Sequence, residues 1–150
     1  MAFNFRFERI LELKRKAEDA LKNELALLNL RKLELVEERE TLLWELESMR
    51  MDFLERQGKG LKGEEMRVYL QFMNSLTFLI NEKDREIARL EREMEGKREE
   101  LLEAIKERKK FERLREKAYE SYLQEELHRE RVFLDEIGQN LFLRGRKIGS

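Results

Sequence analysis

The chain has 150 residues, of which 43% are charged and 41% hydrophobic, with no cysteine, no proline and a formal net charge of −1. This composition is typical of long helices and coiled coils, and it leaves few residues for the loops of a globular domain. The missing cysteines exclude disulfides and thiol chemistry, and the near-zero net charge gives no long-range attraction to nucleic acid or acidic membranes.

The first half of the chain, residues of about 4–57, is predicted to form a helix with one apolar stripe. One row of apolar residues recurs every seven positions, and a second row lies four positions further on. The rows are Leu21, Leu28, Leu35, Leu42 and Met49, then Leu11, Leu25, Leu46 and Phe53. Glu18, Lys32 and Arg39 interrupt the second row. This alternating spacing indicates a coiled-coil seam, in which polar interruptions fix the register at some cost in stability.

Three glycines within residues 58–63 predict a reversal of the chain. Without proline, clustered glycine is where a helix ends most easily. The segment has the glycine spacing of a phosphate-binding loop, but Glu64 and Glu65 replace the required Lys and Ser or Thr, and no strand precedes it. We therefore interpret it as a turn, which would bring position 40 near position 81 and position 11 near position 110.

The second half, residues of about 64–137, repeats the apolar spacing over a longer distance. The row contains Tyr69, Met73, Leu76, Ile80, Ile87, Leu90, Met94 and Leu101, then Ala104, Phe111, Ala118 and Tyr122. Two seams joined by a short turn should pack antiparallel, because each buries the stripe of the other. The expected fold is all-α: one long two-helix antiparallel coiled coil, with the C-terminal helix longer and residues 138–150 forming a flexible tail.

Two apolar surfaces exceed what one seam can bury. After about residue 118 the second helix should outrun the first, which leaves a row that a second chain or a receptor cavity would cover. That row is Tyr119, Tyr122, Leu123, Leu127, Val132, Phe133, Leu134 and Ile137. Near the turn, ten of the 15 residues in Met66–Ile80 are apolar, and Trp44 and Met51 point almost opposite to the first seam. A bend, a dimer contact or a dedicated partner site would each bury this second surplus.

No arrangement of residues indicates catalysis or a cofactor. Glu125 and His128 have the spacing of one half of a di-metal site, but His128 is the only histidine, so we expect no metal. The serines lack a histidine within reach, and a hairpin offers no concave pocket. Lys106–Lys117 carries seven basic and three acidic residues, without an aromatic platform beyond Phe111, and we predict no nucleic-acid binding. No stretch approaches the roughly 20 apolar residues of a membrane span, and no signal peptide is visible, so we expect a cytoplasmic, non-inserted protein.

Three motifs stand in order along nearly the whole chain. They are Phe5-x-Phe7-x-x-Ile10-Leu11-x-Leu13-Lys14 near the start, Tyr69-x-x-Phe72-x-x-x-Leu76 after the turn, and Phe111-Glu112-x-Leu114-x-Glu116-Lys117 followed by Tyr122, Glu126, Arg129 and Leu134-Asp135-Glu136. Together they resemble the FliJ family of flagellar type III export proteins. The sequence departs from the family's usual residues at Trp44, Glu45 and Met49, so we assign no gate contact to the first helix.

The resemblance implies a non-enzymatic stalk similar to the central subunit of rotary ATPases. Its expected partners are the hexameric export ATPase (FliI-like), the export gate protein (FlhA-like) and export chaperones, at the cytoplasmic face of the inner membrane at the flagellar base, with the free chain monomeric. The residues expected to bind the ATPase are Phe5, Phe7, Leu11, Lys14, Tyr122, Arg129 and Arg131. Those expected to bind the gate are Tyr69, Phe72, Leu76 and Leu79.

Three alternatives remain open on the sequence. The same fold suits the stalk protein of an injectisome or of a vacuolar-type rotary ATPase. A homodimeric coiled-coil scaffold would instead bury the 119–137 row and sediment as a salt-stable dimer. Nucleic-acid binding through Lys106–Lys117 would depend steeply on salt.

Overall fold

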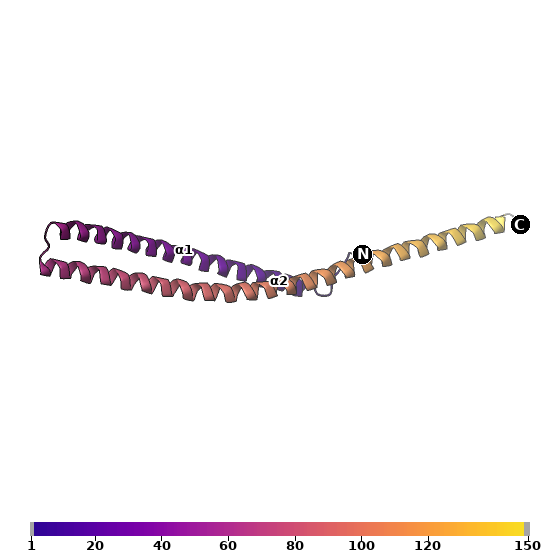
Figure 1. Cartoon of the computed structure of the whole chain (residues 1–150). Coiled ribbons are helices and arrows are strands. Elements are labelled where there is room, and N and C mark those ends of the chain that lie inside the picture. The colour runs from indigo at the N-terminus through magenta and orange to yellow at the C-terminus, as the bar shows by residue number, and fades with distance from the viewer. Residues whose placement is uncertain (1, 149–150) are drawn as a thin grey trace. The chain divides into compact units, whose positions relative to one another are not determined.

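The computed structural model describes residues 2–148, which form two helices, α1 (Glu8–Gly58) and α2 (Gly63–Ile148). The helices pack antiparallel, and α2 is the longer, with 86 residues against 51 (Figure 1). No strand occurs within residues 2–148, so the predicted all-α hairpin with a longer second helix is confirmed. The chain divides into two compact units: Asp19–Glu103, here called the turn unit, and the residues up to Glu18 together with those from Ala104, here called the terminal unit.

The chain reverses between the two helices at the predicted glycines. Gly60 has a φ of 89°, a left-handed conformation that only glycine adopts at little cost. The amide nitrogens of Lys59 and Gly60 donate to the carbonyl oxygens of Arg56 and Gln57 at 3.1 and 3.3 Å, which closes the last turn of α1. The expected turn therefore stands, and it occupies the residues between Gly58 and Gly63.

The core of the turn unit is the predicted seam. Its buried residues form two clusters, Leu35 with Leu90 and Met94, and Leu46 with Leu76 and Ile80. Leu25, Leu28, Ile87, Leu42, Leu43, Met49 and Met73 pack against these clusters. Because apolar residues from both rows alternate at the interface, each helix covers the stripe that the other would leave in water.

The polar interruptions of the seam pair across the helices. Lys32 Nζ lies 3.2 Å from a carboxylate oxygen of Glu91, and Arg39 bonds Asp84. Lys83 Nζ donates to Glu38 at 2.6 Å. These pairs confirm the expected register, in which position 40 lies near position 81.

The predicted start of the first helix near residue 4 is wrong, because α1 begins at Glu8. Residues 2–7 are not helical. Phe3, Phe5 and Phe7 are two positions apart, a spacing that places side chains on one side of an extended chain but on opposite sides of a helix. The Glu8 amide nitrogen donates to the Phe5 carbonyl oxygen at 3.2 Å, which joins this segment to the first turn of α1.

The predicted helix end near residue 137 is also corrected, because α2 continues to Ile148. Gly138 and Gly145 each weaken a helix by about 1 kcal/mol relative to alanine, but neither is followed by proline or by a second glycine. Of the expected tail, residues 138–148 are therefore helical, and Gly149 and Ser150 lie outside the described residues. The flexibility of this segment stays a prediction.

Candidate binding surfaces

The surface beside the turn combines exposed and buried members of the predicted gate set. Phe72 and Leu79 are 46% and 45% exposed, whereas Leu76 is 3% exposed and belongs to the core. Tyr69 is half-buried, and its hydroxyl donates to Asp52 Oδ2 at 2.6 Å. This hydrogen bond to a carboxylate, with partial burial, raises the pKa of Tyr69. Tyr69 thus ties α2 to α1, and of the predicted gate set only Phe72 and Leu79 are exposed.

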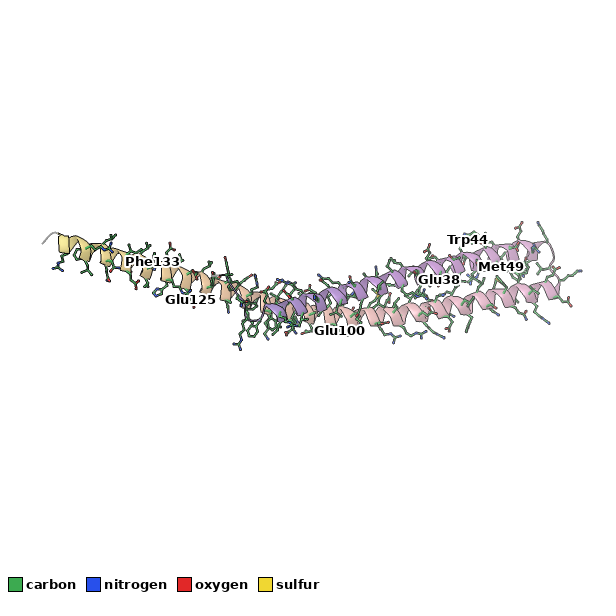
Figure 2. The ribbon with its side chains drawn as sticks, turned by 180° about the vertical axis from the view of Figure 1, so that it is seen from behind. Glu38, Trp44, Met49, Glu100, Glu125 and Phe133 are labelled. Atoms are coloured by element: carbon green, nitrogen blue, oxygen red, sulfur yellow. The ribbon has the colours of Figure 1, made fainter. Side chains whose placement is uncertain are left out.

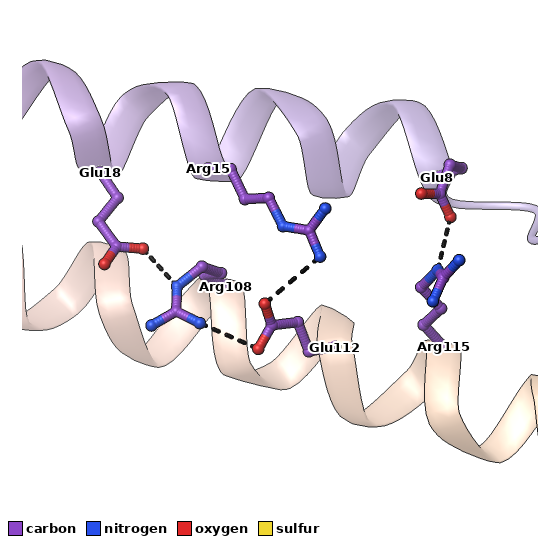
Figure 3. A network of polar contacts seen from close by, with 6 residues as sticks. All are labelled: Glu8, Arg15, Glu18, Arg108, Glu112 and Arg115. Carbon is purple, nitrogen blue, oxygen red and sulfur yellow. Dashed lines mark hydrogen bonds and ion pairs between the residues drawn. The ribbon is translucent and has the colours of Figure 1, made fainter.

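A connected polar network joins α1 and α2 in the terminal unit (Figure 3). Glu18 is 4% exposed, the one charged residue buried in the part of the chain that the structure describes, and it accepts a hydrogen bond from Arg108 Nε. Arg108 also donates to Glu112 at 2.9 Å, and Glu112 lies 3.5 Å from Arg15. Two carboxylates on one guanidinium raise the pKa of Arg108. The sequence treated Glu18 as an interruption of the seam, and the structure shows how it is satisfied.

Further ion pairs extend this network toward the chain start. Arg115 Nε donates to Glu8 at 2.9 Å, and Lys14 Nζ lies 3.9 Å from Glu107. Exposed pairs of this kind contribute little stability one by one, but they orient the side chains that take part. Lys14, a predicted ATPase contact, is therefore held beside α2 at an accessible position.

Aromatic side chains of the first residues pack against aromatic side chains of α2 in the terminal unit. The Phe3 ring contacts Tyr119 and Tyr122 with centroids 5.1 and 5.5 Å apart, and Phe7 contacts Phe111 at 6.2 Å. These rings lie at distances typical of favourable aromatic pairs. The packing of Phe3 was not predicted, although its spacing from Phe5 and Phe7 could have signalled it. Because of this segment, pairing along α2 extends as far as Tyr122.

Beyond these contacts, the last part of α2 carries a row of exposed apolar side chains. Glu125 and Phe133 lie on this single stretch of helix (Figure 2). The exposed residues are Leu123, Leu127, Val132, Phe133, Leu134, Ile137, Leu141, Phe142 and Leu143. The last three were not predicted, because the helix was expected to end before them. Exposed apolar side chains in such number on one stretch of helix make this end of α2 a candidate binding surface.

The remaining predicted ATPase contacts fall into two groups. Phe5 and Leu11 are 7% and 0% exposed, so they are packed inside the terminal unit. Arg129 and Arg131 are exposed on α2, and Arg129 donates to Glu126 at 3.3 Å. The two exposed arginines can contact a partner directly. Phe5 and Leu11 are buried, so they can affect binding only by stabilising the fold of the terminal unit.

The basic side chains of Lys106–Lys117 fall into two groups. Arg108 and Arg115 donate hydrogen bonds to carboxylates of α1, as described above. The others line one shallow hollow on the outer side of α2: Lys106, Lys109, Lys110, Arg113 and Lys117, with Leu114. The sequence showed the excess of positive charge, and the structure shows that the basic residues other than Arg108 and Arg115 gather around this one hollow.

The described residues offer no group of three or more metal-binding side chains. His128 lies in a shallow hollow with Glu125, Gln124, Ser121 and Arg129. Within the same residues, no helix has a stretch that is long and apolar enough to cross a membrane.

Comparison with known proteins decides the family. A family model described as the flagellar FliJ protein matches residues 3–147. The chain belongs to the FliJ family. The Flagellar FliJ protein of Bacillus subtilis (strain 168) is 31% identical over 150 residues, an alignment that covers 95% of this chain and 97% of that relative. No solved structure matches the chain. The family resemblance inferred from the three motifs is thereby confirmed.

Proposed function

We propose that this chain is a non-enzymatic component of the flagellar type III protein export apparatus, which binds the hexameric export ATPase and the export gate through different surfaces. Membership of the FliJ family supports the flagellar assignment. The observation that carries the two-partner proposal is the exposed apolar surface in each unit: residues 123–143 of α2, and Phe72 with Leu79 beside the turn. Burying one such leucine or phenylalanine contributes about 1.5–3 kcal/mol to binding before entropic costs are subtracted.

In the terminal unit, the ATPase contacts are Phe7, Lys14, Tyr122, Arg129 and Arg131. All five are at least partly accessible. Arginine and tyrosine are common among residues that dominate binding energy at interfaces. Phe5 and Leu11 keep their place in the site as buried supports, because they are too little exposed to contact a partner directly.

In the turn unit, the gate contacts are Tyr69, Phe72 and Leu79. Leu76 supports them from the core. Export chaperones are further partners, and the free chain is a monomer that works at the cytoplasmic face of the membrane at the flagellar base. These last points follow from the family resemblance alone.

Binding of the full-length chain to the purified ATPase and to the cytoplasmic domain of the gate tests the proposal. Arg129→Ala with Arg131→Ala should weaken ATPase binding at least tenfold and leave gate binding unchanged, and Phe72→Ala with Leu79→Ala should do the reverse. Leu70→Ala is the matched control for the second pair, because Leu70 is also 45% exposed on α2 but lies on another side of the helix. A double variant that keeps full affinity for its assigned partner would show that the site is wrong.

A homodimeric scaffold is the second candidate function. Leu127, Leu134 and Leu141 are exposed and seven residues apart, which is the spacing of a coiled-coil seam. Sedimentation of the free chain separates the two candidates. A monomer supports the export coupler, and a salt-stable dimer that Leu134→Glu dissociates supports the scaffold.

A further inference from the structure

The outward side of α1 in the turn unit carries a second heptad row. Its members alternate three and four residues apart, and all are exposed: Leu30, Leu33, Glu37, Glu40, Trp44, Glu47, Met51 and Leu54. At 3.6 residues per turn, Trp44 lies roughly 160° around the helix from the seam residue Leu42. Figure 2 shows Trp44 on the side of α1 that faces away from α2, while Met49 lies between the helices. The row is therefore separate from the hairpin seam.

The apolar members of this row are unusually open to water. Trp44 is 73% exposed, Met51 68% and Leu54 62%. Trp44, Glu47, Ser48 and Met51 also line a shallow hollow on α1. Scattered exposed apolar residues need no explanation, but five of them in one heptad register form the surface that a coiled-coil helix offers to a partner.

Every polar position in the row is acidic. Glu40 and Glu47 make ion pairs with Arg39 and Arg50 on their own helix, at 3.7 and 3.1 Å. Such exposed local pairs are worth a few tenths of a kcal/mol and are readily exchanged for better ones. Within residues 2–148, the Glu37 carboxylate has no ion pair or hydrogen bond.

The hairpin seam shows how this protein treats charges at heptad positions. Lys32 in the seam of α1 meets Glu91 across the interface, and Lys97 in the seam of α2 meets Glu24 at 2.9 Å. A helix that covers the outward row must likewise provide positive charge, because a carboxylate buried without a partner costs more than the apolar contacts return.

We propose that the outward row of α1 binds an amphipathic helix of another protein, with apolar residues at heptad spacing and Lys or Arg opposite Glu37, Glu40 and Glu47. A second copy of this chain does not fit through the same row. It would place carboxylates against carboxylates or against apolar side chains, and either arrangement is repulsive or leaves a charge unpaired. The proposed gate contacts Phe72 and Leu79 belong to α2. The binding site on α1 can therefore be tested independently of the proposed export function.

Fluorescence of Trp44 tests the proposal directly, because it is the only tryptophan of the chain. The probe is a synthetic amphipathic helix with leucine at the heptad positions and lysine at the three positions that meet carboxylates. A matched peptide with glutamate in place of those lysines is the control. We expect the lysine peptide to shift the Trp44 emission to shorter wavelength in a saturable way, and the glutamate peptide to leave it unchanged.

Charge reversal in the protein sharpens the test. Glu40→Lys with Glu47→Lys should weaken the lysine peptide about tenfold and reverse the preference between the peptides, since two attractions become two repulsions. Glu93→Lys with Glu99→Lys changes the net charge equally on exposed positions of α2 and should have no effect. Equal binding of both peptides, or an emission shift that depends only on the concentration of the chain itself, would overturn the proposal.

A photo-crosslinker at Ser48 in the full-length protein, in cells of the source organism, tests whether a natural partner occupies the row. The expected adduct joins Ser48 to a basic amphipathic helix of another protein. An adduct to a second copy, to a segment without basic residues, or to nothing would count against the proposal.

Discussion

The two units stabilise the same pair of helices by different means. In the turn unit, Leu, Ile and Met from both helices fill a continuous seam, and ion pairs such as Lys83–Glu38 flank it. In the terminal unit, a buried carboxylate, Glu18, and a set of phenylalanines replace most of that seam. The difference teaches that α2 is packed where both apolar stripes are present and leaves its apolar side chains exposed where only its own stripe continues.

The largest expected effect lies in the seam of the turn unit. Leu76→Ala should lower the free energy of unfolding by about 2–5 kcal/mol, because it removes a side chain that is 3% exposed and leaves a cavity. Chemical unfolding followed by circular dichroism measures this. Leu79→Ala, on the same helix but 45% exposed, is the matched control and should cost about 0.5 kcal/mol or less. Equal costs would mean that the seam does not supply the stability of this unit.

The next effect concerns the buried carboxylate of the terminal unit. Glu18→Gln should lower stability by about 1–2 kcal/mol, because a buried charge-assisted hydrogen bond is weakened. Glu18→Leu combined with Arg108→Leu should recover most of that loss, since apolar residues of similar size often replace a buried ion pair without cost. Thermal unfolding of the single and double variants measures both changes. A double variant less stable than the single one would show that the pair itself is favourable.

Glycine replacements distinguish the paired from the unpaired part of α2. Gly96→Ala should raise the free energy of unfolding by roughly 0.5–1 kcal/mol, because a Cβ there meets no atom within 4 Å and the residue lies inside a helix. Gly138 is equally open, but it lies where α2 has no partner among the described residues. Gly138→Ala should therefore raise the helix content by circular dichroism and leave the main unfolding transition in place. A shift of that transition by Gly138→Ala would indicate that the end of α2 unfolds together with the rest.

The smallest effect is the pH dependence of a surface pair. The hydrogen bond from Lys83 lowers the pKa of Glu38 below its ordinary value of 4.5. A lowered pKa in the folded state stabilises the fold above pH 4.5, and that stabilisation is lost as the pH falls through the lowered pKa. Melting temperatures of the wild type and Glu38→Gln should therefore differ slightly at neutral pH and converge in acid. A difference in melting temperature that grows in acid would show that the fold does not lower the pKa of Glu38.

The sequence by itself determined the helices, the turn and the seam. These follow from local rules: apolar residues every three and four positions select one face of a helix, and clustered glycines permit the reversal. The register followed as well, since a short turn leaves little freedom in how two rows align. The family could also be inferred, because its motifs are local strings of residues.

Only the tertiary structure decided which apolar residues remain available for binding. Phe5 was expected to contact a partner, yet the fold buries it to 7% exposure. The start of α1 at Glu8 has the same origin, because the contact of Phe7 with Phe111 joins residues far apart in the chain. Local patterns specify what a side chain can do, but burial depends on what the fold places opposite it.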